Sequence, residues 1–426
     1  MEFDYKKEPR GDILCIDVKS FFASAECIER GFHPLEKMLV VMSHAENAGG
    51  LILSASPMAK KQLGIQNVSR KFELPCHPDL LIVPPRMSLY ANLNVKINDI
   101  YRSFVSEEDL LIYSIDESFL NVTKSHLLFG KSTYEIAQKI QKKVREETGL
   151  YVTIGIGDNP LLAKLAMDNE AKKTKEMIAE WRYEDVPNTV WKIAPISNMW
   201  GIGFRMEKRL ARIGIDSVYT LAKYDYHLLK KNLGVAGEQL WANAWGIDRS
   251  DFSKRYTPLE KSYGNSQILA RDYEKQREIE IVIREMADQV AARLRAHHCQ
   301  TRCIHLYIRF SHFEAAGGFS HQMAIPATSS SKELAFYCIT LFRKYYKNEA
   351  VRQIGISYSR LLTDEYLQIN LFDSTVRQAV NRNLDKMIDT IRVRYGFSAL
   401  VRGSSLSAGS TAVYRSTLLG GHRAGE

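Results

Sequence analysis

The sequence predicts a multidomain α+β protein in which one order of strands and helices occurs twice. The chain has 426 residues, which at about 150 residues per domain corresponds to two to four domains. Between residues 13 and 157, apolar patterns predict the order strand, helix, strand, strand, helix, strand, a split β-α-β arrangement. The same order is predicted within residues 262–365, although the two halves share no visible sequence repeat.

A long insertion separates the first predicted strand from the first predicted helix. Residues 13–16 form an apolar run that predicts a buried strand ending at Asp17. A helix is predicted from Ser88 onward, and the residues in between, 23–87, form the insertion. The helix is predicted from apolar residues that recur at steps of three and four, namely Leu89, Leu93, Ile97, Ile100 and Phe104.

A second helix and a last strand complete the first pattern. Ser132 and Glu135 have the spacing of a capping box, and Gly149 ends the helix that they begin. Residues 151–157 form a glycine-bounded strand, and a further helix starts with Pro160 in its first turn. The order predicts a ferredoxin-like sheet, while the order of the strands within the sheet stays open.

Three acidic residues lie where predicted strands end. Residues 110–115 and 118–122 are apolar runs on either side of Asp116 and Glu117, which predicts two strands joined by a tight turn. Neighbours along a strand point to opposite faces, so this pair can converge only at a turn or bulge. A solvated turn is the ordinary interpretation, but the flanking apolar runs and the matching acid Asp17 favour a two-metal site. Carboxylate oxygens are the ligands that Mg²⁺ prefers.

The segment after Asp17 has features that suit a phosphate-bearing ligand. Backbone N–H groups at a helix start bind phosphate, and the aromatic rings of Phe21 and Phe22 could lie beneath a sugar or simply pack in the core. Basic side chains that are either triphosphate contacts or surface charges are Lys60, Lys61, Lys172 and Lys173.

The middle and the end of the chain differ in composition from the first sheet. Residues 200–215 place a Gly-Ile-Gly turn before a basic amphipathic helix, which resembles a helix–hairpin–helix unit. Residues 246–262 are polar, lack periodicity and predict a linker. About 26 residues at the C-terminus are rich in Ser and Gly and predict a mobile tail. Cys299, Cys303 and His305 lack the paired spacing of a zinc site, so we expect none there.

Composition limits the class of protein. Lys and Arg outnumber Asp and Glu by 58 to 49, a net charge of +9 that suits a polyanionic partner. The sequence contains no run of 18 apolar residues, so no membrane span is predicted. The N-terminus is too polar for a secretory signal. Six cysteines do not make a disulfide scaffold, so a cytoplasmic protein with reduced thiols is expected.

Taken together, the motifs resemble the Y-family DNA polymerases, which are translesion enzymes, and most of all their UmuC-type branch. The resemblance extends from about residue 12 to residue 372, and the joint occurrence of the motifs in order is specific. The matching segments are CIDVKSFFASAE (15–26), YSIDESFLNV (113–122), TIGIGDNPLLAKLA (153–166), MWGIGFRMEKRLARIGI (199–215) and KSYGNSQILARDY (261–273).

This resemblance implies a right-hand polymerase with a ferredoxin-like palm, small fingers, a helical thumb with a helix–hairpin–helix, and a βαββαβ little finger. The implied boundaries are palm 1–22 and 88–178, fingers 23–87, thumb 179–248, linker 249–261, little finger 262–365, and a clamp-binding peptide with the C-terminal tail at 366–426.

The resemblance also implies roles for individual residues. Asp17 and Asp116 would bridge two Mg²⁺ ions, with help from Glu117 and the Val18 carbonyl, and Phe22 would be the steric gate against ribonucleotides. The implied triphosphate contacts are Ser54, Lys172, backbone N–H groups near Ser20 and Phe21, and either Lys60 or Lys61. The implied DNA contacts are Gly201, Gly203 and Arg205, and a pentapeptide with Gln368, Leu371 and Phe372 resembles a docking motif for the sliding β clamp.

The implied function is template-directed DNA synthesis past damaged bases with low fidelity, as part of damage tolerance and the SOS response. Primer–template DNA, dNTPs and the clamp would be the partners of a monomeric, cytoplasmic enzyme. A nucleotide cyclase also uses a ferredoxin-like sheet with two metal-binding acids, but it does not require a DNA-gripping turn such as residues 200–215. A non-enzymatic scaffold at stalled forks would not require the three acids.

Overall fold

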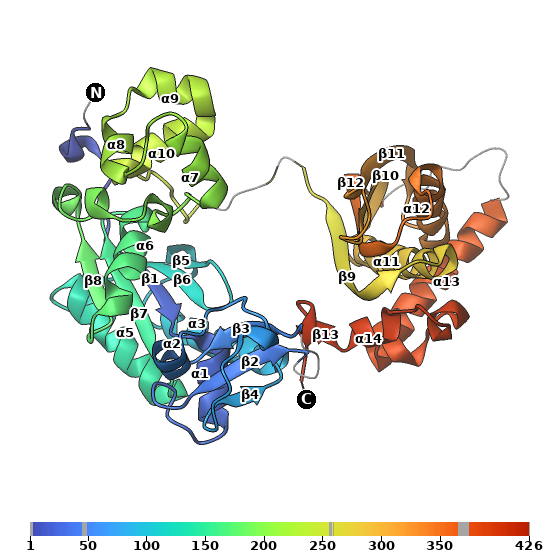
Figure 1. Ribbon diagram of the computed structural model, residues 1–426, viewed down its shortest axis with the longest axis horizontal. Coiled ribbons are helices and arrows are strands. Elements are labelled where there is room, and N and C mark those ends of the chain that lie inside the picture. Colours follow the sequence, from blue (N-terminus) through green and yellow to red (C-terminus); the bar gives the residue numbers. More distant parts are fainter. Residues whose placement is uncertain (1–2, 45–48, 255–257, 259, 365–374, 426) are drawn as a thin grey trace. The chain divides into compact units, whose positions relative to one another are not determined.

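A computed structural model describes residues 3–44, 49–254, 258, 260–364 and 375–425 of the chain. The chain divides into two compact units, residues 1–255 with 422–426, and residues 256–421 (Figure 1).

The first unit is built on a sheet with the strand order β5-β6-β1-β7-β8. β1 lies antiparallel between β6 and β7, so the predicted ferredoxin-like sheet is confirmed and the strand order, which the sequence left open, is established. A short parallel strand, β8, extends the sheet past the predicted palm end at residue 178. The strands are β1 (Ile13–Val18), β5 (Leu110–Ile112), β6 (Glu117–Asn121), β7 (Val152–Gly157) and β8 (Ile178–Trp181).

The two faces of this sheet are covered by different helices. From β1, Leu14, Ile16 and Val18 point into the larger core, which α3 and α5 complete. Ile13 and Cys15 point to the other face, where they pack against α6. The helices are α3 (Met87–Arg102), α4 (His126–Phe129), α5 (Thr133–Thr148) and α6 (Pro160–Asn169).

The helix ends predicted from the sequence are present in the structure, with the expected capping residues. The Ser132 hydroxyl accepts a hydrogen bond from the Glu135 N–H at 3.2 Å and caps α5. Gly149 ends α5 in the left-handed conformation with φ of +72°, which glycine adopts at little cost. Asn159 caps α6 by accepting from the Leu162 N–H, and Pro160 occupies the first turn as expected.

Two glycines of β7 allow α6 to lie unusually close to the sheet. A Cβ atom at Gly155 would come within 2.0 Å of the Ala163 carbonyl oxygen, and one at Gly157 within 2.3 Å of the Ala163 nitrogen. The absence of a side chain at both positions therefore sets how near the α6 side chains come to the sheet.

The insertion between β1 and α3 forms a small sheet of its own, in the order β3-β2-β4, with helices beside it. β2 pairs antiparallel with β3 and parallel with β4. The elements are α1 (Phe21–Glu29), β2 (Leu39–Ser43), β3 (Leu51–Ala55), α2 (Pro57–Leu63) and β4 (Leu81–Val83).

After β8 the chain forms a helical region with its own core, in which Trp241 and Trp245 are buried (Figure 1). Its helices are α7 (Phe204–Ala211), α8 (Val218–Lys223), α9 (Tyr226–Leu233) and α10 (Val235–Ala244). Short 3-10 helices occur along the whole chain, at Tyr5–Lys7, Lys71–Glu73, Glu107–Asp109, Ala171–Lys173, Tyr183–Asp185, Val190–Lys192, Ile196–Asn198, Phe397–Ala399 and Gly403–Leu406.

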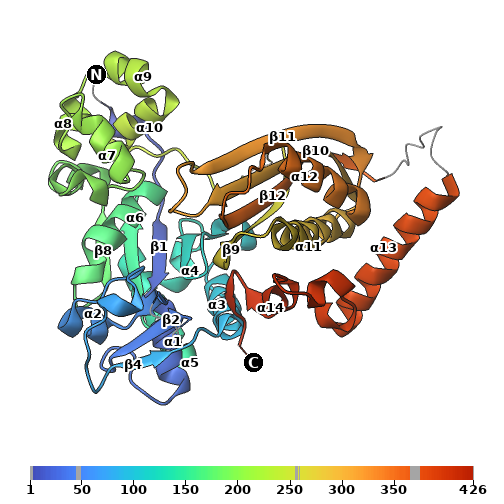
Figure 2. The ribbon, with the colours of Figure 1, turned by 45° about the vertical axis from the view of Figure 1, so that its right-hand side comes forward.

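The second unit has the predicted order of strands and helices along the chain, but the strands of its sheet lie in a different order from those of the first unit's sheet. The strand order is β11-β10-β12-β9, with α11 and α12 packed on the sheet (Figure 2). His305, Tyr307 and Arg309 lie on the more exposed face of β10, as its alternation predicts. The elements are β9 (Tyr263–Tyr273), α11 (Gln276–Ala296), β10 (Cys299–Phe310), β11 (Gly318–Thr328), α12 (Ser331–Tyr345) and β12 (Val351–Thr363).

The prediction of a mobile C-terminal tail is wrong for the residues around 411. Glu285 of α11 accepts hydrogen bonds from the backbone N–H groups of Thr411 and Ala412, at 3.0 and 3.1 Å. Buried polar contacts of this kind order a segment whose composition alone predicts disorder. The C-terminal elements are α13 (Thr375–Tyr395), α14 (Ala412–Ser416), β13 (Leu418–Leu419) and β14 (His422–Arg423).

None of the helices in the described part of the chain is long and apolar enough to cross a membrane.

We expect Gly155→Ala to lower the free energy of unfolding of the first unit by about 3 kcal/mol, because the added methyl group must displace α6 from β7. Thermal unfolding followed by circular dichroism measures the effect. Gly203→Ala is the matched control, since a Cβ atom there meets nothing within 4 Å. Equal melting temperatures for the two variants would contradict the close packing of α6.

Candidate active site

The three predicted acids meet where β1 and β6 pair. Asp17 lies directly opposite Glu117 in the antiparallel register. The Val18 N–H donates to the Asp116 carbonyl oxygen at 2.9 Å, which fixes the turn beside the end of β1. Directly opposite residues in an antiparallel pair have their side chains on the same face. The structure thus brings Asp17 and Glu117 together on one face, with Asp116 in the adjoining turn.

This face is the one covered by α6. Cys15, two residues before Asp17, donates its thiol to Glu117 Oε1 at 3.1 Å. The Asp17 and Glu117 side chains are 19% and 10% exposed, whereas Asp116 is only half-buried. Asp116 Oδ1 accepts a hydrogen bond from the Ser114 hydroxyl at 2.7 Å. The three carboxylates therefore lie at the border between the core and solvent.

Two lysines and a fourth acid link these carboxylates. Lys164 Nζ lies 2.7 Å from Glu117 Oε1 and 3.2 Å from Asp168 Oδ2. Lys172 Nζ lies 2.8 Å from Asp168 Oδ1 and 3.5 Å from Asp17 Oδ2. The result is a chain of alternating charges from Glu117 to Asp17, in which Asp168 joins the two lysines.

Lys172 was predicted from the sequence as a site residue, whereas Lys164 and Asp168 were not. The signal was present, because the three residues are spaced by four along α6 and its continuation, which places them on one side of a helix. Lys164 is largely buried, and its Nζ also lies over the rings of Tyr113 and Trp200, at 5.9 and 5.8 Å from the centroids.

The charges at this site are not balanced. Burial is the largest of the causes that raise the pKa of Asp17 to about 6; the neighbouring carboxylates of Asp116, Glu117 and Asp168 also raise this pKa, and Lys172 lowers it. Burial lowers the pKa of Lys172, but Asp17 and Asp168 outweigh burial and the pKa is raised. Two ammonium groups contact the carboxylates of Asp17, Glu117 and Asp168, and the raised pKa of Asp17 indicates that the site favours additional positive charge.

The residue types fit divalent cations with a preference for oxygen. Hard carboxylate oxygens are suitable ligands for Mg²⁺. Within the described residues, no group of His, Cys, Asp and Glu is arranged as a ready-made metal cage. In this structure, Lys164 and Lys172 instead contact the acids that would bind such ions.

The start of α1 lies next in the chain after Asp17. Ser20 adopts a left-handed conformation with φ of 49° and precedes the helix. The Ser54 hydroxyl of β3 accepts a hydrogen bond from the Ala23 N–H at 3.4 Å, so Ser54 lies beside this helix start. Phe21 is buried in the core, whereas Phe22 is only partly buried.

Lys60 and Lys61 of α2 differ in their surroundings. Burial lowers the pKa of Lys60, while Asp17 raises it and Lys172 and Lys19 lower it, so Lys60 lies within electrostatic reach of the acids. Lys61 is exposed. The structure thus brings Lys60 toward the site and leaves Lys61 at the surface of the small sheet.

The aromatic ring of Phe22 rests on that of Tyr90. The two rings are stacked, with centroids 4.4 Å apart and planes inclined by 13°. Tyr90 belongs to α3 and is fully buried. We did not single out Tyr90 from the sequence, where it is one apolar residue of an amphipathic helix.

The other predicted sites lie apart from the acids. Gly201, with φ of +92°, forms the turn before α7, Gly203 precedes that helix, and Arg205 belongs to its first turn. All three are exposed. The predicted clamp-binding residues, Gln368, Leu371 and Phe372, lie outside the described residues.

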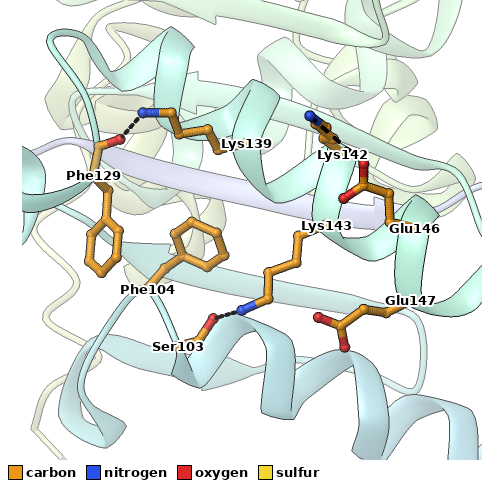
Figure 3. A pocket seen from close by; sticks show the side chains of 8 residues that line it. All are labelled: Ser103, Phe104, Phe129, Lys139, Lys142, Lys143, Glu146 and Glu147. Atoms are coloured by element: carbon orange, nitrogen blue, oxygen red, sulfur yellow. Dashed lines mark hydrogen bonds and ion pairs between the residues drawn. The ribbon is translucent and has the colours of Figure 1, made fainter.

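A surface pocket between α3 and α5 is a separate feature (Figure 3). Lys143 crosses it, donating to the Ser103 hydroxyl at 2.8 Å, and Lys139 donates to the Phe129 carbonyl at 2.7 Å. Because α3 and α5 cover the face opposite α6, this pocket does not belong to the cluster of acids.

Both units of the chain match models of one protein family. Residues 16–168 match the family model described as the impB/mucB/samB family, and residues 260–371 match the model of that family's C-terminal domain. The chain is 42% identical over 421 residues to a protein named putative UV-damage repair protein UvrX from Bacillus subtilis, with 99% of each chain covered. It is 34% identical to a protein named DNA polymerase IV 2 from the same organism, over 96% of this chain and 98% of the relative.

A solved structure supports the same fold. A Y-family DNA polymerase chimera, Dbh-Dpo4(243-245)-Dbh, aligns with a TM-score of 0.66 at 19% sequence identity, covering 83% of this chain and 99% of the chimera.

The raised pKa of Asp17 predicts how stability depends on pH in the absence of metal. The native state takes up a proton near pH 6, whereas an ordinary aspartate does so near 3.8, so lowering the pH through this window stabilises the native state. The substitution Asp17→Asn replaces the carboxyl group with an amide that does not ionise. We therefore expect it to raise the free energy of unfolding by about 3 kcal/mol at pH 8 and by only about 1 kcal/mol at pH 4.5.

Urea unfolding in the presence of a chelator measures both differences, with the exposed Asp99→Asn as the control. The same difference at both pH values would contradict the description of Asp17 as a buried carboxylate repelled by its neighbours.

Proposed function

The chain belongs to the impB/mucB/samB family of Y-family translesion DNA polymerases, and we propose that it adds nucleotides to a primer at the three acids by a two-metal mechanism. It is a DNA-directed DNA polymerase of the translesion type that acts in DNA repair. The observation that carries the proposed mechanism is the pairing of Asp17 with Glu117 beside Asp116.

In this mechanism Asp17 and Asp116 would hold the Mg²⁺ ions, with Glu117 and the Val18 carbonyl as further ligands. Such ions, when bound, would lower the pKa of the primer 3′-hydroxyl and stabilise the charge that develops on the phosphates. The carboxylates transfer no proton themselves; they position positive charge. Lys164, paired with Glu117 at 2.7 Å, orients that carboxylate.

The triphosphate is bound by basic and polar groups that come from the start of α1, from β3 and α2, and from the short helix after α6. Lys172 and Lys60 supply positive charge, Ser54 supplies a hydroxyl, and the backbone N–H groups near Ser20 and Phe21 lie at the start of α1. Lys60 is preferred over Lys61 because Asp17 acts on the pKa of Lys60, whereas the Lys61 side chain is exposed. On nucleotide binding, Lys172 exchanges its contact with Asp17 for the phosphate oxygens.

Phe22 is proposed as the steric gate. Phe22 belongs to α1, the first helix after β1. Its ring is partly buried and rests on the buried ring of Tyr90. A fixed aromatic wall at the sugar leaves no room for a 2′-hydroxyl, and discrimination then comes from a clash rather than from a favourable contact.

Two further contacts extend the proposal beyond the acids. The turn at Gly201 and Gly203, with Arg205, suits binding to DNA phosphates without reading the sequence. The segment with Leu371 and Phe372 is proposed to bind the sliding β clamp, because two large apolar side chains can fill one pocket. We also propose that the enzyme is monomeric and cytoplasmic.

We expect Asp116→Ala to reduce primer extension in Mg²⁺ by at least about 1,000-fold while the affinity for primer–template DNA persists, since the acid acts on the metal ions and not on DNA. Gel-based extension and fluorescence anisotropy measure the two properties. Asp99→Ala, which removes an exposed acid of α3, should extend normally. Full activity of Asp116→Ala would remove this acid from the mechanism.

Phe22→Ala should raise incorporation of ribonucleotides relative to deoxyribonucleotides by about 100-fold or more, because the wall that excludes the 2′-hydroxyl is removed. Single-nucleotide kinetics with each sugar give the ratio of the two kcat/KM values. If the ratio stays as in the wild type, the gate is another residue.

Replacement of both Leu371 and Phe372 by Ala should abolish stimulation of synthesis by the clamp and leave clamp-free synthesis intact, because the apolar anchors are lost. Surface plasmon resonance with immobilised clamp and a parallel extension assay test this. Equal clamp binding by both forms would refute the docking peptide.

A further inference from the structure

Glu26 is a fully buried carboxylate that the proposed mechanism does not use. It belongs to α1, one helical turn after Phe22, and its side chain is 0% exposed. Arg86 approaches both of its oxygens, with Nε 3.0 Å from Oε1 and Nη2 2.8 Å from Oε2. Arg30 pairs with Oε2, and the Tyr90 hydroxyl donates to Oε1 at 2.7 Å.

A buried cluster of this kind is stable because both oxygens of the carboxylate accept hydrogen bonds. A buried charge without partners is strongly destabilising, whereas one with several charge-assisted hydrogen bonds is held in a single orientation. Burial raises the pKa of Glu26, but hydrogen bonds from Arg86, Tyr90 and Arg30 outweigh burial and the pKa is lowered. Glu26 is therefore ionised near neutral pH and anchors its neighbours.

The cluster fixes the rotation and position of the Tyr90 ring. The Tyr90 hydroxyl donates to Glu26 and also accepts from the Arg86 N–H at 3.2 Å, so it is satisfied in one orientation. The face of the same ring stacks on Phe22, at 4.4 Å between centroids. The path from Glu26 to Phe22 thus consists of one hydrogen bond and one ring contact.

We propose that Glu26 and Tyr90 are positioning residues that set the enzyme's sugar selectivity by keeping the Phe22 ring in place. This inference rests on the proposed role of Phe22 as the gate. A steric wall excludes a 2′-hydroxyl only to the extent that moving the wall is costly, and close-packed neighbours make that movement costly. Once the Tyr90 ring is free to shift, Phe22 yields and the ribose is accepted.

The test compares two mild variants of the full-length protein, Tyr90→Phe and Glu26→Gln. The first keeps the ring and removes its anchoring hydroxyl, and the second keeps the shape of Glu26 and removes its charge. We expect each to lower the ratio of kcat/KM for a dNTP to that for the matching rNTP by about 10-fold, the effect expected for one hydrogen bond to a charged group. This ratio is informative because a general loss of folded enzyme lowers both values equally.

Tyr183→Phe is the matched control. Tyr183 is as buried as Tyr90, and its hydroxyl donates to the Pro9 carbonyl at 2.9 Å, but it packs in the helical core and not against Phe22. Its removal should leave the selectivity ratio unchanged.

A double-variant cycle separates this inference from the gate assignment. If the proposal holds, adding Tyr90→Phe to Phe22→Ala lowers the ratio no further, because the supported ring is already gone. If Phe22→Ala itself leaves the ratio unchanged, the gate assignment fails. If Phe22→Ala relaxes selectivity while Tyr90→Phe and Glu26→Gln do not, Phe22 remains the gate and the positioning role is overturned. Should Glu26→Gln fail to fold, Tyr90→Phe alone decides between these outcomes.

Discussion

The register between β1 and β6 is the constraint on which the candidate site depends. With Asp17 opposite Glu117, both side chains fall on the face covered by α6, and the turn that carries Asp116 lies beside the end of β1. A shift of one residue would turn Glu117 toward the opposite core and separate it from Asp17. The same register keeps Leu14, Ile16 and Val18 in the larger apolar core, so the packing that stabilises the sheet also fixes the positions of the acids.

The acids make this site electrostatically costly to assemble, and α6 offsets part of the cost. Lys164 and Lys172 reach Glu117 and Asp17 only because Gly155 and Gly157 let the helix lie close to β7. Even so, the pKa of Asp17 is raised to about 6, which indicates that repulsion and burial exceed the compensation from lysine. A site with this remaining demand for positive charge is suited to an enzyme that recruits divalent cations together with its substrate.

Much of this arrangement was predictable from local sequence signals, and the remainder depends on contacts between distant residues. Ser132, Gly149 and Pro160 mark helix ends because their chemistry acts within a few residues, and the hairpin at Asp116 follows from two apolar runs around a turn. The register of β1, and hence the opposition of Asp17 and Glu117, is fixed by the whole core and was not predictable. Lys164 and Asp168 were missed because a charged residue in an amphipathic helix is usually solvated. The order around Thr411 was missed because it depends on Glu285, which lies 126 residues away.

The most direct test of the account is to locate the metal ions. Crystals of the enzyme with primer–template DNA and a non-reactive nucleotide, soaked in Mn²⁺, would reveal bound ions by anomalous scattering. We expect two peaks among the carboxylates of Asp17, Asp116 and Glu117, and we expect both to be lost in Asp116→Ala. Ions bound only elsewhere, with Lys164 and Lys172 still contacting Glu117 and Asp17, would contradict it.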